Sequence, residues 1–289
     1  MVIGTAGALS VMPVLKELGY GFGLPQIGSP LGERAMPSQQ TVLLVGGSGR
    51  TGQRVLEQLL SRGASVRVLV RSPGKLRPGT AENPHVTVVE ADLLSLSDDD
   101  VRRHLRGCNA VISCLGHVIS VRGVFGPPRD LVTQATARLC RGIEALQPAE
   151  PVRFVLMSSV SVNHPEGLDT RRGIFERLIV WMLRGLIPPA RDNQQAADFL
   201  WRNIGAAHPF VQWVAVRPDT LLDGDASEYA LHEGLASSLF APARTNMSHV
   251  AHFMCELVAN PEVWGVWKGK LPVLVNAAEV ERGADGVRA

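Results

Sequence analysis

The stretch Val45-Gly46-Gly47-Ser48-Gly49-Arg50-Thr51-Gly52 decides the fold, because it joins a short apolar run at 41–45 to a helical pattern at 51–62. Its glycines recur at every third position from residue 46 to residue 52. In such a loop the first glycine permits a tight turn, the second lets backbone N–H groups approach a pyrophosphate, and the third lets the helix pack on the strand. Because a helix N-terminus attracts anions, the sequence predicts a dinucleotide site formed by Gly46, Gly47, Ser48, Gly49, Arg50, Thr51 and Gly52. A purely structural glycine turn is the alternative.

The rest of the chain repeats this alternation of short and long apolar patterns. Continuous apolar runs predict strands at 41–45, 65–70, 86–90, 110–113, 152–157, 211–216 and 272–275. Apolar residues at helical spacing predict helices at 51–62, 98–105, 129–146, 192–203 and 248–258. Runs without polar alternation are typical of strands that helices cover on both faces. The sequence therefore predicts an α/β fold with a doubly wound parallel sheet.

The same patterns divide the chain into four segments. Residues 1–38 carry Gly, Pro and Ser at short intervals toward their end, which predicts an N-terminal extension or linker. Residues 39–225 are expected to form the dinucleotide-binding domain, 226–276 a small C-terminal lobe with the last strand, and 277–289 a polar tail. The uncharged stretch at 1–15 is shorter than a bilayer requires and is followed by Lys16, so we expect neither a membrane span nor a signal peptide.

Composition excludes several classes of protein. With 289 residues, 45% of them hydrophobic, the chain can bury a large core, which excludes a disordered chain. A net charge of +2 without a basic block argues against nucleic acid as a partner. The four cysteines lack the paired spacing of a zinc site and are expected to be reduced thiols of a cytoplasmic protein. His249 and His252 share a helical pattern but have no third ligand, so no metal is expected.

The end of the second strand indicates which dinucleotide binds. An acidic residue there accepts hydrogen bonds from an adenosine ribose, whereas an arginine pairs with a 2′-phosphate. The strand ends at Arg71 and no carboxylate follows through Lys75, so the sequence predicts NADP(H) rather than NAD(H). Arg50 and Lys75 are placed to close on the same phosphate, unless all three are solvated loop charges. Asp92, after the third strand, is placed either to meet the adenine or to cap the strand end.

These residues resemble the atypical, NAD(P)-binding branch of the short-chain dehydrogenase/reductase superfamily, which includes NmrA-like and biliverdin reductase B-like proteins. The resemblance runs from residue 41 to residue 276, and its marks beyond the glycine loop and Arg71 are Asp92-Leu93, Ser113-Cys114-Leu115-Gly116, Ser158-Ser159, Arg217-Pro218 and residues 250–254. The resemblance implies a Rossmann sheet in which Leu93, Leu115 and Gly116 lie beside the cofactor. It also implies that Ser158 faces the nicotinamide and that Pro218 lies near its amide.

The chain departs from that superfamily at the helix that carries the catalytic tyrosine and lysine. Ordinary members donate a proton from a tyrosine that is helped by a lysine one helical turn later. Neither Tyr20 nor Tyr229 has such a lysine. Matching residues 197–200 to the corresponding segment of the family places Ala190 and Gln194 where the tyrosine and lysine would be. Both titratable groups are therefore missing.

Other side chains are candidates for proton transfer. Asp192 is either a carboxylate near the nicotinamide or, with a glutamine three residues later, the capping box that begins a helix after Pro188-Pro189. His117 and His164 follow the fourth and fifth strands, at the edge where ligands bind in this topology, although each also fits a solvated or structural loop histidine. Ser158, Asp192 and His117 are the predicted catalytic residues.

The segment 171–187 is apolar over much of its circumference and carries Arg177 and Arg184. Such a helix belongs in a core or in a dimer interface, or it serves as an apolar substrate lid or a membrane-surface contact. These alternatives stay open at the level of sequence.

The sequence as a whole predicts an NADP(H)-binding protein whose function has two alternatives. The first is an oxidoreductase of the atypical short-chain dehydrogenase type, which transfers a hydride to a small, mostly apolar substrate without a Tyr-x-x-x-Lys pair. The second is a non-catalytic, NmrA-like dinucleotide sensor. Both need the glycine loop, so the loop does not separate them. The expected partners are a small-molecule substrate and, through the apolar segment, a second copy of the chain.

Overall fold

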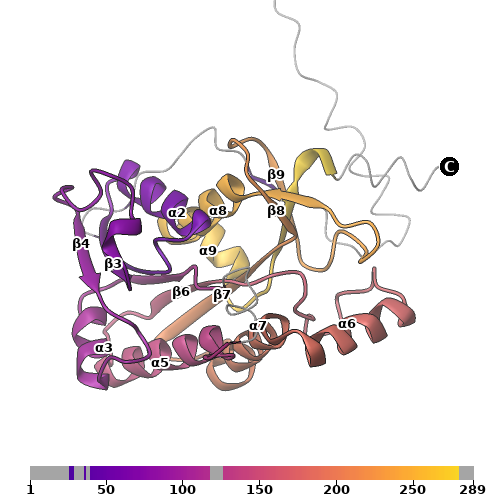
Figure 1. Ribbon diagram of the computed structural model, residues 1–289, viewed down its shortest axis with the longest axis horizontal. Helices are drawn as coiled ribbons and strands as arrows, with labels where there is room; N and C mark the ends of the chain where they lie inside the picture. The colour runs from indigo at the N-terminus through magenta and orange to yellow at the C-terminus, as the bar shows by residue number, and fades with distance from the viewer. Residues whose placement is uncertain (1–25, 29–35, 37–39, 118–125, 280–289) are drawn as a thin grey trace, which may run out of the picture.

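Within residues 26–28, 36, 40–117 and 126–279, which the computed structural model describes, nine strands form one sheet. In chain order these strands are β1 (Gln26–Gly28), β2 (Thr41–Val45), β3 (Ser65–Val70), β4 (Val86–Glu90), β5 (Ala110–Ser113), β6 (Val152–Met157), β7 (Val211–Pro218), β9 (Tyr229–His232) and β11 (Val273–Asn276). They lie side by side in the order β1-β9-β11-β7-β6-β5-β2-β3-β4. Figure 1 labels β3, β4, β6, β7 and β9 among them. From β11 to β4 all neighbours are parallel, whereas β9 and β1 pair antiparallel.

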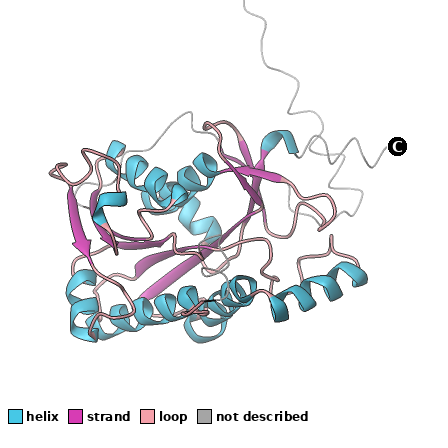
Figure 2. Cartoon of the chain, viewed as in Figure 1, coloured by secondary structure: helices cyan, strands magenta, loops and turns pink. Residues whose placement is uncertain are grey.

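Helices cover both faces of this sheet (Figure 2). One face carries α2 (Arg50–Ser61), α8 (Met247–Ala259) and α9 (Pro261–Trp267), and the other carries α3 (Asp98–Leu105), α5 (Leu131–Leu146) and α7 (Pro188–Phe199). The helix α6 (Ile174–Leu186) extends beyond α7 at one end of its layer (Figure 1). Two short strands, β8 (Thr220–Leu222) and β10 (Arg244–Asn246), form a separate parallel pair.

Both faces of the parallel strands are buried, which explains their continuous apolar runs. In β2, Val42 and Leu44 pack into the cluster under α2 and α8, while Leu43 and Val45 pack into the cluster under α3 and α5. Alternate side chains of a strand point to opposite faces, so a strand between two helix layers needs apolar residues at every position. The predicted α/β fold with a doubly wound parallel sheet is confirmed.

The strand order reverses between β2 and β5, and this reversal places the site. Val45, the last residue of β2, lies opposite Leu69 of β3 on one side and Ser113 of β5 on the other. The chain moves outward from β2 to β3 and β4, then returns to add β5, β6 and β7 on the far side. Ligands of such sheets bind in the crevice at the carboxyl ends of the strands, beside the reversal. The loops that follow β2 to β7 therefore meet at one edge.

The predicted strand bounds match the structure from β2 to β6, while β7 continues to Pro218 and β11 covers Val273–Asn276. The N-terminal expectation is wrong at one place. Gln26–Gly28, inside the segment predicted to be a linker, forms β1 and pairs with Tyr229–Leu231 of β9. The strands β9 and β11 of the predicted C-terminal lobe extend the main sheet rather than standing apart from it. An open strand edge leaves backbone N–H and C=O groups unpaired, and a short distant segment satisfies them here.

A buried polar cluster joins α2, α8 and β9. The Tyr229 hydroxyl and Nδ1 of His252 are 2.9 Å apart, and Arg62 on the turn after α2 pairs with Glu256 at 2.5 Å. Burial lowers the pKa of His252 to about 4, and the positive charge of Arg62 acts in the same direction, against the opposing effect of Glu256. His252 is therefore neutral in the folded protein at pH 7.

Stability should depend on pH through this histidine. The unfolded chain binds a proton on His252 near pH 6.5, whereas the folded protein does so only near pH 4. The contribution of His252 to the free energy of unfolding should therefore be fully present above about pH 6.5. It should fall by about 3 kcal/mol as the pH is lowered from about 6.5 to 4. Denaturation by urea at a series of pH values measures this slope. His252→Gln should flatten it and the exposed control His85→Gln should not; equal slopes in the wild type and His252→Gln would contradict the assignment.

Candidate active site

The glycine loop after β2 lies in backbone contact with the end of β5. Gly46 has φ +77°, and a Cβ there would lie 2.5 Å from the carbonyl carbon of Cys114. A Cβ at Gly52 would overlap the carbonyl oxygen of Gly46. Only glycine fits these two positions, because any side chain would push the loop off β5 or lift α2 off the loop. The first and third glycines are therefore required by the protein itself.

Gly49 differs from the other two glycines of the triplet. It is exposed, its φ of −77° suits any residue, and the nearest atom to a Cβ there is the Gly46 carbonyl oxygen at 3.3 Å. Gly49 is also the N-cap of α2, where no side chain makes a cap hydrogen bond and no acidic residue occupies the first turn. The first N–H groups of a helix lack partners within it and attract anions. The loop thus presents an uncapped helix N-terminus beside a glycine that the fold does not require.

Gln53 fixes this loop to the turn that follows β3. Its amide nitrogen donates to the carbonyl of Ser48 (3.1 Å) and to that of Lys75 (2.8 Å), which ends the short 3₁₀ turn Pro73–Lys75. Sequence reasoning missed this residue, because its partner lies 22 positions away and leaves no local pattern. The contact holds the segment from Arg71 to Lys75 against the glycine loop.

The cations near this edge fall into two groups. Arg54 pairs with Asp223, and Arg77 pairs with Glu57. Arg50, Arg71 and Lys75 are exposed, and within the described residues none of their side chains makes a hydrogen bond or an ion pair. The second group is therefore the set of charges available to an anion at the tip of β3.

In the loop after β4, two predicted site residues make contacts within the protein. Asp92 is exposed, and its carboxylate accepts a hydrogen bond from the N–H of Leu94 at 3.0 Å. Leu93 is 5% exposed and belongs to the core under α3 and α5, so it can meet a ligand only through its backbone. Arg138 of α5 donates to the carbonyls of Leu93, Leu94 and Leu96 and holds this loop in place.

The residues after β6 and β7 surround the half of the edge opposite the glycine loop. Ser158 follows β6, and its N–H donates to the carbonyl of Val216 at 2.7 Å. Its hydroxyl is buried and has no partner within the described part of the chain. Pro218 is buried at the end of β7. A buried hydroxyl without a partner at a ligand-binding edge is suited to a hydrogen bond with a bound molecule.

Arg217 turns its side chain away from the edge. It is fully buried, donates to both carboxylate oxygens of Asp169 at 3.0 and 3.1 Å, and donates to the carbonyls of Val162, Glu233 and Leu271. Burial lowers its pKa, and the Asp169 carboxylate opposes that effect. Asp169 also accepts from the N–H groups of His164 and Leu235. The Arg217–Asp169 pair fixes the loop after β6 to the segments beside β9 and β11. No local pattern in the sequence predicts this pair.

Asp192 caps a helix other than its own. The predicted capping box is wrong, because α7 begins at Pro188, with prolines in its first turn, and Asp192 lies inside it with 1% exposure. Proline favours the first turn of a helix, where its missing N–H costs nothing. The Asp192 carboxylate instead accepts from the N–H of Val132 (2.8 Å), the N–H of Thr133 (2.9 Å) and the Thr133 hydroxyl (2.7 Å), at the start of α5.

His117 completes that cluster. It follows β5, and its Nε2 lies 2.8 Å from the carboxylate of Asp192. Because the carboxylate accepts hydrogen bonds, Nε2 carries the proton that it donates to Asp192. Three elements thus converge on one buried acid: the tail of β5, the start of α5 and the middle of α7. The structure brings together two of the three predicted catalytic residues, His117 and Asp192.

The missing tyrosine and lysine have no replacement at their positions. Gln194 of α7 accepts from the N–H of Asn163 at 2.8 Å and donates to Asp198 at 2.9 Å, so it joins α7 to the loop after β6. Ala190 carries no titratable group. Tyr229 is buried in β9 against His252, where desolvation raises the pKa of its hydroxyl, and Tyr20 lies outside the described residues.

His164 makes its contacts within the protein. The Nδ1 of His164 accepts from the N–H of Glu166 at 3.2 Å, and desolvation lowers its pKa. Its ring also packs edge-on against Trp201 at 6.0 Å between centroids. These contacts describe a structural loop histidine. In the part of the chain that the structure describes, no group of three His, Cys, Asp or Glu side chains is arranged for a metal ion.

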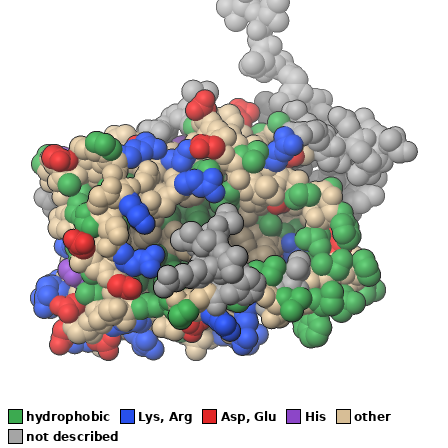
Figure 3. Space-filling model, in the orientation of Figure 1, with side chains coloured by type: hydrophobic (Ala, Val, Ile, Leu, Met, Phe, Trp, Pro, Cys, Tyr) green, Lys and Arg blue, Asp and Glu red, His purple; other side chains and the backbone are tan. Residues whose placement is uncertain are grey.

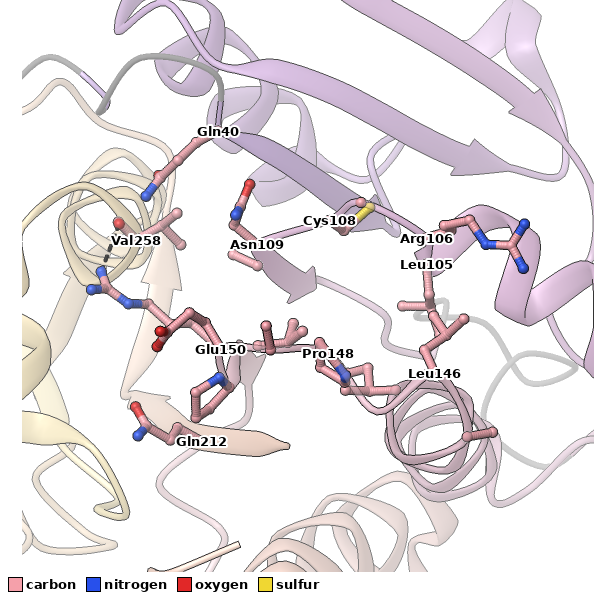
Figure 4. Close-up of a pocket in the computed structure, with 18 residues that line it drawn as sticks. Gln40, Leu105, Arg106, Cys108, Asn109, Leu146, Pro148, Glu150, Gln212 and Val258 are labelled. Carbon is pink, nitrogen blue, oxygen red and sulfur yellow. Dashed lines mark hydrogen bonds between the residues drawn. The ribbon is translucent and has the colours of Figure 1, made fainter. Parts of the chain in front are cut away.

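A cavity of about 940 Å³ opens at the opposite edge of the sheet (Figure 4). It is lined by residues at the amino ends of the strands, including Gln40 before β2 and Asn109 before β5, and Arg153 beside it donates to the Val258 carbonyl at 2.8 Å. Burial raises the pKa of the Cys108 thiol in its wall to about 11, which makes that thiol unreactive at neutral pH. The glycine loop follows the other end of β2, so this cavity is not part of the candidate active site.

Comparison with known proteins agrees with this geometry. A family model described as NAD(P)H-binding matches residues 46–261. An uncharacterised chloroplastic protein of Arabidopsis thaliana is 31% identical over 128 residues, a match that spans 42% of each chain. An oxidoreductase of Lactococcus lactis is similar with a TM-score of 0.59 and 16% identity, over 86% of this chain and 97% of that one. A short-chain dehydrogenase/reductase of Veillonella parvula in complex with NADP is similar with a TM-score of 0.57 and 14% identity, over 83% of this chain and 96% of that one. At these identities the structures share the fold, and they fit the resemblance seen in the sequence.

Substitution of Gly49 should separate ligand binding from folding. Gly49→Val places a side chain 3.3 Å from the Gly46 carbonyl oxygen, a contact that a shift of a few tenths of an ångström relieves, and where a pyrophosphate would approach the backbone. We expect circular dichroism and the melting temperature to stay close to the wild type while NADPH binding, followed by fluorescence titration, is lost. Gly52→Val should unfold the loop region and lower the melting temperature, and Gly173→Val, at an open surface position, should change neither property. Binding by Gly49→Val with wild-type affinity would show that the loop is only structural.

Proposed function

The chain belongs to the NAD(P)H-binding family, and from that premise we propose that it is an NADP(H)-dependent oxidoreductase acting on a small, mostly apolar substrate. The observation that carries the proposal is the uncapped N-terminus of α2 beside Gly49. This end of the helix has no side-chain cap at Gly49 and no acidic residue in its first turn, and it lies at the carboxyl edge next to the reversal of strand order. A pyrophosphate supplies the negative charge that such a helix end favours.

The residues proposed to hold the dinucleotide follow successive strands. The glycine loop binds the pyrophosphate, Arg71 the 2′-phosphate, and Asp92 with the backbone of Leu93 the adenine. Leu115 and Gly116 lie beside the riboses, and Pro218 beside the nicotinamide amide. Leu115 is half-buried and Gly116 is exposed, and both come directly after Cys114, the residue following β5 against which the glycine loop packs. The order of the strands supports this path, because the loops after β4, β3, β2, β5, β6 and β7 are neighbours along one edge.

The preference for NADP(H) over NAD(H) rests on charge pairing. Arg54 and Arg77 already have carboxylate partners, whereas Arg71 at the tip of β3 has none within the described residues. A 2′-phosphate offers an arginine the bidentate acceptor that suits its planar donors. A 2′-hydroxyl would leave Arg71 without a partner.

When bound, the nicotinamide supplies a hydride. The chain must position the substrate and allow one proton to reach it. We assign the unpartnered Ser158 hydroxyl as the donor to a substrate oxygen. Asp192 holds Nε2–H of His117 and so fixes the orientation of the imidazole at the same edge. His117 or solvent then provides the proton, because α7 offers neither tyrosine nor lysine.

A non-catalytic dinucleotide sensor is the second candidate function. The observation that favours it is that the polar side chains of α7 already have partners within the protein. Gln194 is hydrogen-bonded to Asn163 and Asp198, and Asp192 accepts hydrogen bonds from the start of α5. NADPH consumption against quinones, flavins, enones and tetrapyrroles separates the two functions. Saturable NADPH binding without turnover on any compound would favour the sensor over the oxidoreductase.

Arg71 should decide the choice of dinucleotide. In the wild type we expect NADP to bind more tightly than NAD, and in Arg71→Glu the order should reverse, because a carboxylate repels the 2′-phosphate and accepts from ribose hydroxyls. Isothermal titration with both dinucleotides measures the two affinities. Arg106→Glu, an exposed arginine at the opposite edge of the sheet, is the matched control and should leave both unchanged. Equal affinities of the wild type for NADP and NAD would exclude the assigned role of Arg71.

Turnover should depend on Ser158 and not on Tyr229. Ser158→Ala removes a donor aimed at the substrate and should lower kcat by about a hundredfold at unchanged NADPH affinity. Ser159→Ala is the neighbouring control, because the Ser159 hydroxyl is already engaged with that of Ser161 at 2.6 Å. Tyr229→Phe should leave kcat nearly unchanged. If Tyr229→Phe abolishes turnover while NADPH still binds, the catalytic centre lies elsewhere.

A further inference from the structure

The helix α6 turns its apolar side chains outward. Its large side chains are between 48% and 88% exposed at six positions: Ile174, Phe175, Leu178, Trp181, Met182 and Leu186. We call these six residues the apolar ridge. Figure 3 shows hydrophobic side chains gathered over this end of the molecule, where Figure 1 places α6. The expectation of a core helix is therefore wrong, and a patch of this kind marks a contact surface.

The inward face of α6 is narrow and carries one apolar and one acidic side chain, so the other apolar side chains point outward. Val180 is 4% exposed, and the buried carboxylate of Glu176 accepts from the N–H of Leu239 at 3.0 Å. Just before the helix, Arg172 donates to the carbonyl of Val160 at 2.7 Å. The helix is thus fixed to the body by one face. Leu239 is followed by Phe240, which is 69% exposed.

The ridge occupies one continuous sector of the helix. At 3.6 residues per turn its six side chains span about 140° of the circumference, and Arg177 lies just outside one margin. Arg177 and Arg171 are exposed, whereas Glu176, the acidic residue of the first turn, points into the protein. An apolar sector with tryptophan inside it and arginine at its margin is the pattern of a helix that lies in a membrane interface.

We propose that the apolar ridge docks on the surface of an anionic lipid bilayer. A helix of 13 residues is about 20 Å long, so it can lie in the interface but cannot span it. Among the described helices, none combines the length and hydropathy needed to cross a bilayer. The ridge enters the acyl boundary while the arginines remain at the level of the anionic headgroups.

Charge favours a lipid surface over a second copy of the chain. A two-fold dimer through the ridge would place α6 against α6, since such an interface uses the same patch on both subunits. The exposed arginines would then meet no exposed acidic side chain of α6, because Glu176, the acidic residue of this helix, is turned inward in each copy. An anionic bilayer supplies the missing negative charge. This proposal does not depend on whether the protein turns over a substrate.

Vesicle binding tests the proposal with the full chain. Of the five tryptophans, Trp213, Trp264 and Trp267 are buried and Trp201 is half-buried, so Trp181 reports on the ridge. With vesicles of phosphatidylcholine and phosphatidylglycerol we expect flotation and a blue shift of tryptophan emission. Both should weaken with pure phosphatidylcholine and at high salt. Trp181→Phe should keep flotation and lose the blue shift.

Variants assign the effect to α6. Phe175→Asp combined with Trp181→Asp should abolish flotation while NADPH binding is retained. Val266→Asp, on α9 in the opposite helix layer and 39% exposed, is the matched control and should float like the wild type. The proposal would be overturned if the protein floated with neither vesicle, or if the double variant still floated. A concentration-dependent dimer that the double variant dissociates would overturn it as well. A Trp181 emission already blue-shifted without vesicles would also overturn it, because the ridge would then be covered within the protein.

Discussion

The close backbone contact between Gly46 and the end of β5 is the constraint on which the candidate site depends. The turn after β2 lies against the carbonyl of Cys114 with no room for a Cβ, and Gly52 lets α2 begin directly over that turn. These contacts fix the helix N-terminus at the reversal of strand order between β2 and β5. Gln53 then ties the turn after β3 to the same loop. The anion-binding half of the edge follows from this packing.

Two buried acids organise the other half. Asp192 satisfies backbone N–H groups at the start of α5 and holds His117, while Asp169 pairs with Arg217 and holds the loop after β6. A buried carboxylate is costly unless several donors surround it, and each of these acids has them from more than one element. The helix that carries tyrosine and lysine in ordinary short-chain dehydrogenases here carries a structural carboxylate. In the proposed function this carboxylate positions His117 rather than donating a proton.

The places where we propose that this molecule meets others are marked by groups without partners within the described residues. Arg54 and Arg77 are paired on the surface of the protein, but Arg71 at the tip of β3 is not, within the described residues. Ser158 has a buried hydroxyl with no protein acceptor or donor there. On α6 the acidic side chain is buried and the apolar ones are exposed, the reverse of a helix that packs on a core. The buried hydroxyl and the exposed apolar face cost free energy in isolation, and the ligand and the lipid surface proposed above would relieve that cost.

The sequence by itself determined what depends on neighbours along the chain. The bounds of β2 to β6, the parallel α/β fold and the glycine loop follow from apolar runs and turn chemistry within a few residues. The tertiary structure alone decided what depends on distant partners. Asp192 caps α5 because Val132, 60 positions away, presents its N–H there; Gln26–Gly28 is a strand because β9 offers an edge. The sequence showed that the segment 171–187 is apolar over much of its circumference, but only the packing of Glu176 against Leu239 decided which side chains of α6 point outward.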